Sequence, residues 1–286
     1  MDATAIPVRE LTACAVRAAR AAGAIALDGF RSPDLAVETK ADMYDLVTRY
    51  DGECEARIRE ILAAEFPGSR IIGEEGGETD GTDREAGGAG AIEWHVDPID
   101  GTSNFARGVA MWAVSIAAVV DGEVVSGVVY DPVAGDLFWA DDRGAFLGDT
   151  PIRSRGSADP ARAMVAMNFP LARDLVHFPE LALEQFAEVT RAFGQVRSLG
   201  STCIALCWIA AGWLDATVSF ETSSWDVAAA AFIVRRAGGT YVAYRDGEAQ
   251  PPAGDFAHPH YFAAVAGAEF PMLREIMRTQ SLRPAR

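Results

Sequence analysis

The most informative stretch of this chain is WHVDPIDGTSNF, residues 94–105. Its first part is an apolar run typical of a buried strand. Pro98 keeps Asp97 out of the helical region, which predicts that the strand ends there. Residues 100–102, Asp-Gly-Thr, have the composition of a helix start. We therefore expect the two carboxylates to leave the end of a strand and face one point, as two hard oxygen ligands.

The same stretch also predicts a place for an anion. Main-chain N–H groups of Gly101 and Thr102 at the predicted helix start can hold a phosphate oxygen, helped by the helix dipole. Metal and phosphate sites would then lie next to each other. Taken alone, however, Asp-Pro-x-Asp-Gly is equally the composition of an ordinary turn.

Acidic residues in two other segments favour the metal interpretation. Glu74 and Glu75 follow the apolar residues 71–73, and Asp226 stands at a predicted helix start directly after Trp225. Each is unremarkable by itself, the first pair as solvated loop charges and Asp226 as an N-cap. Carboxylates at three strand ends or helix starts are nevertheless what an oxygen-ligated Mg²⁺ requires.

The first half of the chain is predicted to contain two amphipathic helices and a sheet. The predicted helices cover residues 8–30 and 51–66. The predicted strands cover residues 70–73, 92–97, 112–120, 124–130 and 137–140, of which the last three form an antiparallel meander. Residues 76–90 are rich in Gly, Asp and Thr, so we expect an exposed mobile loop there.

Beyond about residue 150, strands and helices alternate, which indicates a layered α/β half. Strands are expected at residues 163–167, before Leu199, at 215–219, and near Tyr241 and Phe262. Helices are expected at residues 181–193, 203–211 and 226–237, and from Glu269. We therefore predict two closely joined halves, 1–150 and 151–286, with the active site at their junction.

Composition narrows the possible partners. The chain has 25 basic and 41 acidic side chains and a formal net charge of −16, which argues against nucleic acid or an anionic membrane surface as partner. A small acidic substrate remains compatible if cations lie between it and the protein. The four cysteines show no paired CxxC pattern, so we expect buried thiols in a reducing cytoplasm. Neither an export signal nor a membrane anchor is predicted.

The three acidic segments together resemble the inositol monophosphatase family. Its signatures are a Gly-Glu-Glu strand end, a Trp-x-x-Asp-Pro-x-Asp-Gly-Thr-x-Asn-Phe segment and a Trp-Asp-x-Ala-Ala segment, and all three are present in that order. Residues 45–51, 127–130, 144–147 and 200–201 also match family positions. The resemblance runs from about residue 10 to 270. It implies the layered α-β-α-β-α fold of these sugar phosphatases, in the α/β class, and a homodimer.

The resemblance also implies roles for individual residues. Two Mg²⁺ ions would be held, with a third, weaker one near Glu74. The implied metal ligands are Glu74, Asp97, the carbonyl of Ile99, Asp100 and Asp226. Asp51 and Thr102, with Glu74 beside them, would orient and deprotonate the attacking water, while Gly101 and Thr102 would hold the phosphate. Lys40, the only lysine of the sequence, matches a mobile-loop lysine that closes over the metals in relatives.

These residues predict a Mg²⁺-dependent phosphomonoesterase acting on inositol monophosphate or a similar polyol or sugar phosphate. A phosphate dianion repels hydroxide, and two cations on shared carboxylates neutralise charge, activate water and stabilise the leaving alkoxide. Relatives with the same motifs hydrolyse fructose bisphosphate, histidinol phosphate or adenosine bisphosphate, so these activities remain alternatives. A catalytically silent regulatory protein with this fold is a further alternative. The resemblance also implies inhibition by Li⁺.

The alcohol side of the substrate is where the sequence departs from its relatives. In inositol-preferring members a glutamate stands six residues before the motif tryptophan, and counting back from Trp225 gives Ser219. A serine supplies no charge, so we expect broad hydrolysis with weak discrimination. The alternative is a loop realigned by two residues, in which Glu221 takes the role. Gly200 and Ser201 are further expected substrate contacts.

The remaining aromatic and histidine residues near the motifs are expected to be structural. His95 is expected only to pack, and no catalytic or zinc role is expected for the other histidines, His177, His258 and His260. Trp94 and Trp225 are expected to support the metal loops by core packing rather than to stack on substrate.

Overall fold

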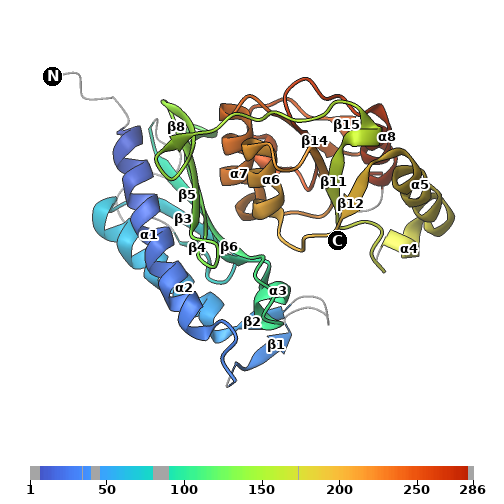
Figure 1. The fold of residues 1–286 in the computed structure, drawn as a ribbon. Coiled ribbons are helices and arrows are strands. Elements are labelled where there is room, and N and C mark those ends of the chain that lie inside the picture. Colours follow the sequence, from blue (N-terminus) through green and yellow to red (C-terminus); the bar gives the residue numbers. More distant parts are fainter. Residues whose placement is uncertain (1–6, 34, 40–45, 80–89, 173, 283–286) are drawn as a thin grey trace.

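The computed structural model describes residues 7–33, 35–39, 46–79, 90–172 and 174–282, which form five alternating layers of helices and sheets (Figure 1). The first layer contains α1 (Val8–Gly29) and α2 (Arg49–Glu65). The central layer contains α6 (Thr202–Ala211) and α7 (Ser224–Arg236). The last layer contains α5 (Pro179–Ala192) and α8 (Pro271–Gln280). The predicted α-β-α-β-α order is confirmed.

An eight-stranded sheet lies between the first two helix layers, in the order β10-β9-β8-β7-β6-β5-β3-β4. Its strands are β3 (Arg70–Gly73), β4 (Gly77–Thr79), β5 (Ile92–Asp100), β6 (Ala113–Val120), β7 (Glu123–Asp131), β8 (Asp136–Asp141), β9 (Gly144–Leu147) and β10 (Thr150–Pro151). All neighbours are antiparallel except β3 and β5, which run parallel. The predicted meander is therefore confirmed as β6, β7 and β8.

A six-stranded mixed sheet separates the central helices from the last layer, in the order β12-β11-β13-β16-β14-β15. Its strands are β11 (Met164–Met167), β12 (Gln195–Arg197), β13 (Ala216–Ser219), β14 (Thr240–Arg245), β15 (Glu248–Ala249) and β16 (His260–Ala264). The small elements of the described chain are the paired strands β1 (Val37–Thr39) and β2 (Leu46–Thr48), the short helices α3 (Thr102–Ala106) and α4 (Asp174–His177), and two 3-10 helices, η1 (Pro160–Arg162) and η2 (Asp255–Ala257). The division into halves at residue 150 stays a prediction, because α7 packs on both sheets.

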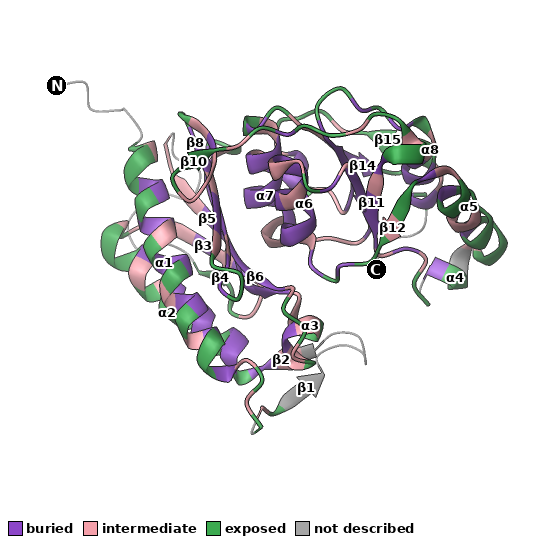
Figure 2. Ribbon diagram, in the orientation of Figure 1, coloured by how far each residue is buried: buried purple, intermediate pink, exposed green. Residues whose placement is uncertain are grey.

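Strand β6 shows why the layers hold together. All its residues are buried, because helices cover both faces of the sheet (Figure 2). Val114 and Ile116 belong to the apolar core shared with α1 and α2. Ala113 and Ala117 belong to the second core, which extends through α6 and α7 to the other sheet. Alternate residues of β6 thus belong to two separate apolar cores, one on each face of the sheet.

A glycine on the neighbouring strand brings α7 close to the sheet. A Cβ atom at Gly127 of β7 would lie 2.5 Å from the carbonyl oxygen of Ala229 in α7. A larger residue would push the helix away from the sheet, since backbone cannot yield as a flexible side chain does. Gly127 therefore helps to determine the depth at which α7 sits.

Two predicted boundaries were wrong in the first sheet. Strand β5 does not end at Pro98 but continues to Asp100, with a register shift between Asp97 and Asp100. The shift lets the ladder pass a residue that has no N–H to donate. The predicted loop at 76–90 contains strand β4, which pairs antiparallel with β3. Its three residues are exposed as expected, and pairing through the backbone leaves no periodic pattern to detect.

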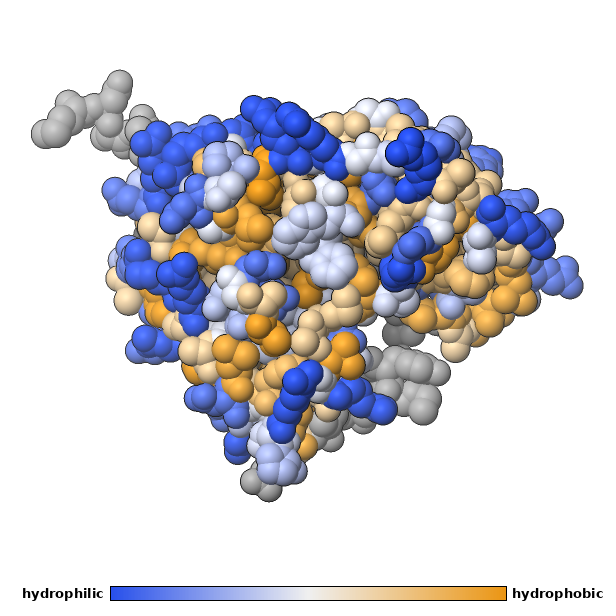
Figure 3. Space-filling model, viewed as in Figure 1, coloured by the Kyte–Doolittle hydropathy of each residue, from blue (hydrophilic) through white to orange (hydrophobic). Residues whose placement is uncertain are grey.

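Some predictions concern the surface and termini of the fold. Lys40 lies outside the described residues. The four cysteines are free and buried, as predicted. None of the described helices is both long and apolar enough to cross a bilayer. On the face shown in Figure 3, hydrophilic side chains are interspersed with apolar ones.

Candidate metal centre

Parallel pairing of β3 and β5 brings two acidic segments together. Gly73 lies opposite Val96 in the ladder, so Glu74 directly follows β3 beside Asp97, and its N–H donates to the Val96 carbonyl at 3.2 Å. Residues three apart on a regular strand face opposite sides of the sheet. The register shift after Asp97 breaks this alternation, and Asp97 and Asp100 approach the same point.

Helix α7 supplies the third carboxylate. Asp226 stands in the first turn of the helix, where its Oδ2 accepts the Ser223 N–H at 2.7 Å. Oxygen atoms of Asp97, Asp100 and Asp226 all lie within 4.8 Å of one another. The structure therefore unites two of the three acidic segments in one cluster and places Glu74 next to it.

Asp100 is held at the N-terminus of α6. Its carboxylate accepts the Cys203 N–H at 2.8 Å and the Thr202 N–H at 3.2 Å. The Ser201 hydroxyl also donates to Asp100. These donors and the helix dipole favour the charged form of the carboxylate. Ser201, predicted as a substrate contact, thus directs its hydroxyl to a carboxylate of the cluster.

Burial, in contrast to these hydrogen bonds, favours the neutral form of the carboxylates. It raises the pKa of Asp100 to about 6, and burial together with the charge of Asp100 raises the pKa of Asp226 to about 8. The pKa of Asp97 is raised well above its usual value by burial and by the charges of Glu74, Asp100 and Asp226. No basic side chain among the described residues forms an ion pair with Asp97, Asp100 or Asp226.

This donor set fits a hard divalent cation. All its side-chain ligands are carboxylate oxygens, the type that Mg²⁺ prefers. An added cation would also offset the mutual repulsion of the buried charges. The chemistry of the cluster therefore agrees with the Mg²⁺ expected from the sequence.

A second acidic group stands beside the cluster on α2. Asp51 is fully buried in a capping box, where Thr48 donates to its Oδ2 from N–H at 2.8 Å and from Oγ1 at 2.7 Å. The Thr102 hydroxyl lies 3.2 Å from Asp51 Oδ1 and 3.0 Å from the Ile99 carbonyl. Burial and the negative charge of Glu74 raise the pKa of Asp51. The Asp51 and Thr102 pair predicted from the sequence is thus in hydrogen-bonding contact.

Gly101 forms the sharp corner between β5 and α3. Its φ is 98°, in the left-handed region that favours glycine, and α3 begins at Thr102 as predicted. A Cβ atom here would lie 3.0 Å from the Met111 carbonyl and 3.2 Å from the Gly200 carbonyl. This close approach places the loop before α6, which contains Gly200 and Ser201, next to the segment that contains Asp97 and Asp100.

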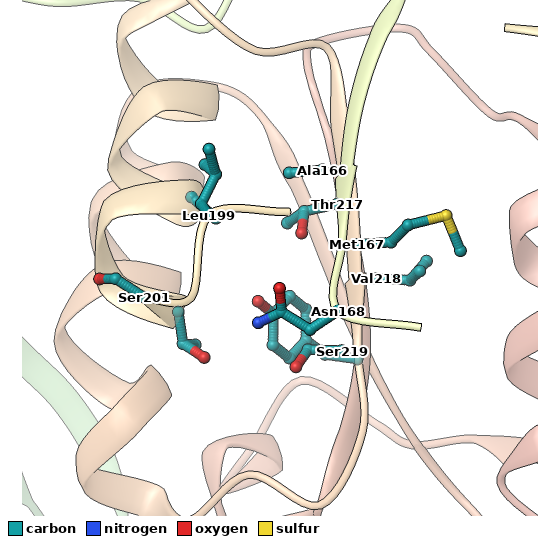
Figure 4. A pocket seen from close by; sticks show the side chains of 11 residues that line it. Ala166, Met167, Asn168, Leu199, Ser201, Thr217, Val218 and Ser219 are labelled. Atoms are coloured by element: carbon teal, nitrogen blue, oxygen red, sulfur yellow. The ribbon is translucent and has the colours of Figure 1, made fainter. Parts of the chain in front are cut away.

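A small pocket opens between α6 and β13 (Figure 4). Ser201, Thr202, Ser219 and Asn168 supply polar groups to its lining, and Asn168 Oδ1 accepts the Ser198 hydroxyl at 2.7 Å. Ser219, predicted as the alcohol contact, lines this pocket. Glu221 is not among the lining residues. Its backbone is left-handed, with φ 58°, and its N–H donates to His260 Nδ1 at 3.2 Å.

The prediction that His95 only packs was wrong. His95 Nδ1 lies 2.7 Å from the hydroxyl of Ser224 at the start of α7, and Nε2 lies 2.8 Å from Glu93 Oε1. Arg70 in turn donates to Glu93 at 2.7 Å. In the sequence, the alternation that puts Glu93 and His95 on one face of the strand indicated a polar face. Only the structure shows that helix α7 packs against this face. Trp94, on the other face, is fully buried as predicted, whereas Trp225 is partly exposed.

Two further residues that sequence reasoning missed are Glu55 and Arg59 of α2. Glu55 is 2% exposed, and both of its oxygens accept N–H groups of the turn that follows Glu74. Their spacing of four on one helix face gave a weak signal, because a charged pair at this spacing normally lies on a solvated surface.

Comparison with known proteins agrees with this combination of fold and acidic site. The chain belongs to the inositol monophosphatase family, whose model matches residues 8–275, and the resemblance inferred from the motifs is confirmed. The chain is 34% identical to the Nus factor SuhB of Pasteurella multocida, over 84% of this chain and 87% of that one. It is 35% identical to the inositol-1-monophosphatase of Caulobacter vibrioides, over 78% and 84%. The crystal structure of extragenic suppressor protein suhB from Bartonella henselae matches with a TM-score of 0.79 and 26% identity, over 96% and 100%.

Proposed function

We propose that this protein is a Mg²⁺-dependent phosphomonoesterase that hydrolyses inositol monophosphate or a similar polyol or sugar phosphate. The observation that carries the proposal is the cluster of Asp97, Asp100 and Asp226, which is without a basic partner among the described residues. Two to three Mg²⁺ ions, when bound, would supply charge neutralisation and water activation. The proposed ligands are Glu74, Asp97, the carbonyl of Ile99, Asp100 and Asp226.

Asp51 and Thr102 would handle the proton of the attacking water. Burial holds the Asp51 pKa above its ordinary value, which makes the carboxylate a stronger base. The Thr102 hydroxyl, 3.2 Å from Asp51 Oδ1, connects this base to the segment that holds the phosphate. Main-chain N–H groups of Gly101 and Thr102 are proposed to hold phosphate oxygens, and Lys40 is proposed to approach from its loop.

Ser219 is proposed as the alcohol contact because it stands six residues before Trp225, where inositol-preferring relatives have a glutamate, and because it lines one small pocket together with Ser201. A neutral hydroxyl discriminates polyols weakly, so we expect broad specificity. Glu221→Ala and Ser219→Ala are expected to cause similar small losses on inositol 1-phosphate and on glycerol phosphate. A large loss confined to inositol 1-phosphate in Glu221→Ala would overturn the Ser219 assignment.

The proposed function is tested by phosphate release with and without Mg²⁺. The panel contains inositol 1-phosphate, glycerol phosphate, fructose 1,6-bisphosphate, histidinol phosphate and adenosine 3′,5′-bisphosphate. We expect turnover of the polyol phosphates only with Mg²⁺, and inhibition by millimolar Li⁺. Faster turnover of one of the last three esters would identify a different activity of the family. Mg²⁺ binding without release from any ester would instead support a silent regulatory protein.

We propose a homodimer in the cytoplasm, as the family resemblance implies, without nucleic acid or membrane as partner. The net charge of −16 supports the exclusion of nucleic acid, because a nucleic-acid backbone would be repelled. Light scattering after gel filtration measures the oligomeric state. Electrophoretic mobility with RNA and DNA tests the exclusion of nucleic acid.

A further inference from the structure

A side chain of helix α2 binds the turn that contains Glu74. Glu55 Oε2 accepts the Glu75 N–H and Glu55 Oε1 accepts the Gly76 N–H, both at 2.8 Å. Hydrogen bonds to a carboxylate are roughly twice as strong as neutral ones, and this carboxylate is almost completely buried. The turn therefore depends on one side chain from another element for its conformation.

Arg59, one helical turn further along α2, orients this carboxylate and reaches past it. Its Nε donates to Glu55 Oε1 at 2.7 Å, and its Nη2 donates to the Gly77 carbonyl at 2.5 Å. Its Nη1 donates to the Thr79 hydroxyl. The pair thus binds the turn and strand β4 beyond it, while the ion pair balances the buried charge of Glu55.

Gly73 and Gly76, which flank Glu74 and Glu75, leave space for the Glu55 carboxylate. A Cβ atom at Gly73 would lie 2.5 Å from the Glu55 carboxylate, and one at Gly76 would lie 2.6 Å from it. Neither residue has a positive φ, so a steric reason rather than backbone freedom explains the glycines. The Gly-Glu-Glu-Gly pattern of residues 73–76 leaves room for the carboxylate of another helix.

We propose that Glu55, oriented by Arg59, is a positioning residue that holds Glu74 in place for Mg²⁺. Glu55 stands four residues after Asp51 on the same helix. Helix α2 therefore carries both the proposed base, Asp51, and the residue that positions the proposed metal ligand Glu74. The inference rests on the proposed function, in which Glu74 binds the metal. Loss of such outer contacts weakens metal affinity by about 10- to 100-fold.

The test uses full-length Glu55→Gln, Glu55→Ala and Arg59→Lys. The amide of Gln keeps one oxygen acceptor but turns a donor toward the other N–H, so Glu55→Gln should lie between wild type and Glu55→Ala. Glu60→Gln is the matched control, because Glu60 pairs with Arg57 on the exposed side of the same helix. Mg²⁺ affinity is measured by calorimetry, and hydrogen exchange is followed at the amides of Glu75 and Gly76.

We expect Glu55→Gln to weaken Mg²⁺ binding by about 10-fold or more, with faster exchange at both amides. Turnover of inositol 1-phosphate should recover toward the wild-type value at saturating Mg²⁺, which a merely unfolded variant would not show. Unchanged Mg²⁺ affinity in folded Glu55→Gln and Glu55→Ala would overturn the inference, even if exchange increased. No Mg²⁺ binding by wild type would overturn the proposed function instead, and the exchange data would still decide whether Glu55 holds the turn.

Discussion

Two environments of buried acidic groups in this protein can be compared. Three are paired with arginine: Glu55 with Arg59, Asp141 with Arg143, and Asp255 with Arg235. The cluster of Asp97, Asp100 and Asp226 has hydrogen-bond donors but no arginine partner among the described residues. Arginine thus balances three buried carboxylates, whereas the cluster has no basic partner among the described residues and its charge is suited to a cation from solution.

The difference has opposite consequences for folding. A buried carboxylate with its arginine is balanced, so removing one partner leaves an uncompensated charge and destabilises the fold. The unpaired cluster is already unfavourable without metal, because burial and mutual repulsion raise the pKa values of its members. Neutralising a member should therefore impair function more than folding.

The largest expected effect follows from Asp100→Asn, which removes one charge from the unpaired cluster. Turnover with Mg²⁺ should fall by more than about 100-fold, since even outer-shell changes cost about 10- to 100-fold. The melting temperature in EDTA should not fall, because an unfavourable charge is lost. A variant with wild-type turnover would break the contrast between the two kinds of site.

A second effect concerns pH. The folded pKa of Asp226, about 8, and that of Asp100, about 6, lie above the ordinary 3.8, so the metal-free fold binds more protons than the unfolded chain between about pH 4 and 8. Its stability should consequently fall as the pH rises through this window. Mg²⁺ requires the deprotonated carboxylates, so its affinity should rise from pH 6 to 8.

Thermal melts in EDTA and Mg²⁺ calorimetry in buffers of different ionisation enthalpy measure these two trends. Asp226→Asn is the control, because it should flatten the pH dependence of the melting temperature. Mg²⁺ binding at pH 7 without proton release would contradict the raised pKa values.

The same change at an arginine-paired position sharpens the comparison. Asp141 is fully buried, and Arg143 donates to it from Nε at 2.9 Å and Nη2 at 2.5 Å. Asp141→Asn should lower the free energy of unfolding by about 1 to 3 kcal/mol, because charge-assisted hydrogen bonds are lost. Turnover at 25 °C should stay near wild type. Urea denaturation and steady-state kinetics provide the two measurements, and a loss of turnover without loss of stability would contradict the assignment.

The smallest expected effect is at His95, which bridges Glu93 and the start of α7 near Asp226. His95→Phe should weaken Mg²⁺ affinity by no more than about 10-fold, since one outer contact is lost while backbone capping of Asp226 remains. His95→Gln, which can still reach Ser224, should recover part of the loss. Equal Mg²⁺ affinity in wild type and both variants would show that the His95 hydrogen bonds do not support the metal site.

Local pattern was enough for much of the fold. The helical period predicted α1 and α2 to within two residues at each boundary, and tight turns between apolar runs predicted the β6, β7 and β8 meander. Prediction failed where backbone pairing carried no side-chain pattern, as at β4, and where a bulge let β5 pass Pro98.

The sequence by itself determined the chemical types of the candidate site, because carboxylates at strand ends and helix starts can be recognised from neighbouring residues alone. The alternation of helical and strand periods indicated a helix pair with a sheet and an α/β half, while the order of the five layers was implied by the resemblance of the motifs to the family. Only the tertiary structure decided that Ser201 faces Asp100, that Ser219 rather than Glu221 lines the pocket, and that Glu55 and His95 contact the acidic segments. Such contacts join residues 20 to 129 positions apart, and their geometry depends on how layers pack rather than on local preference.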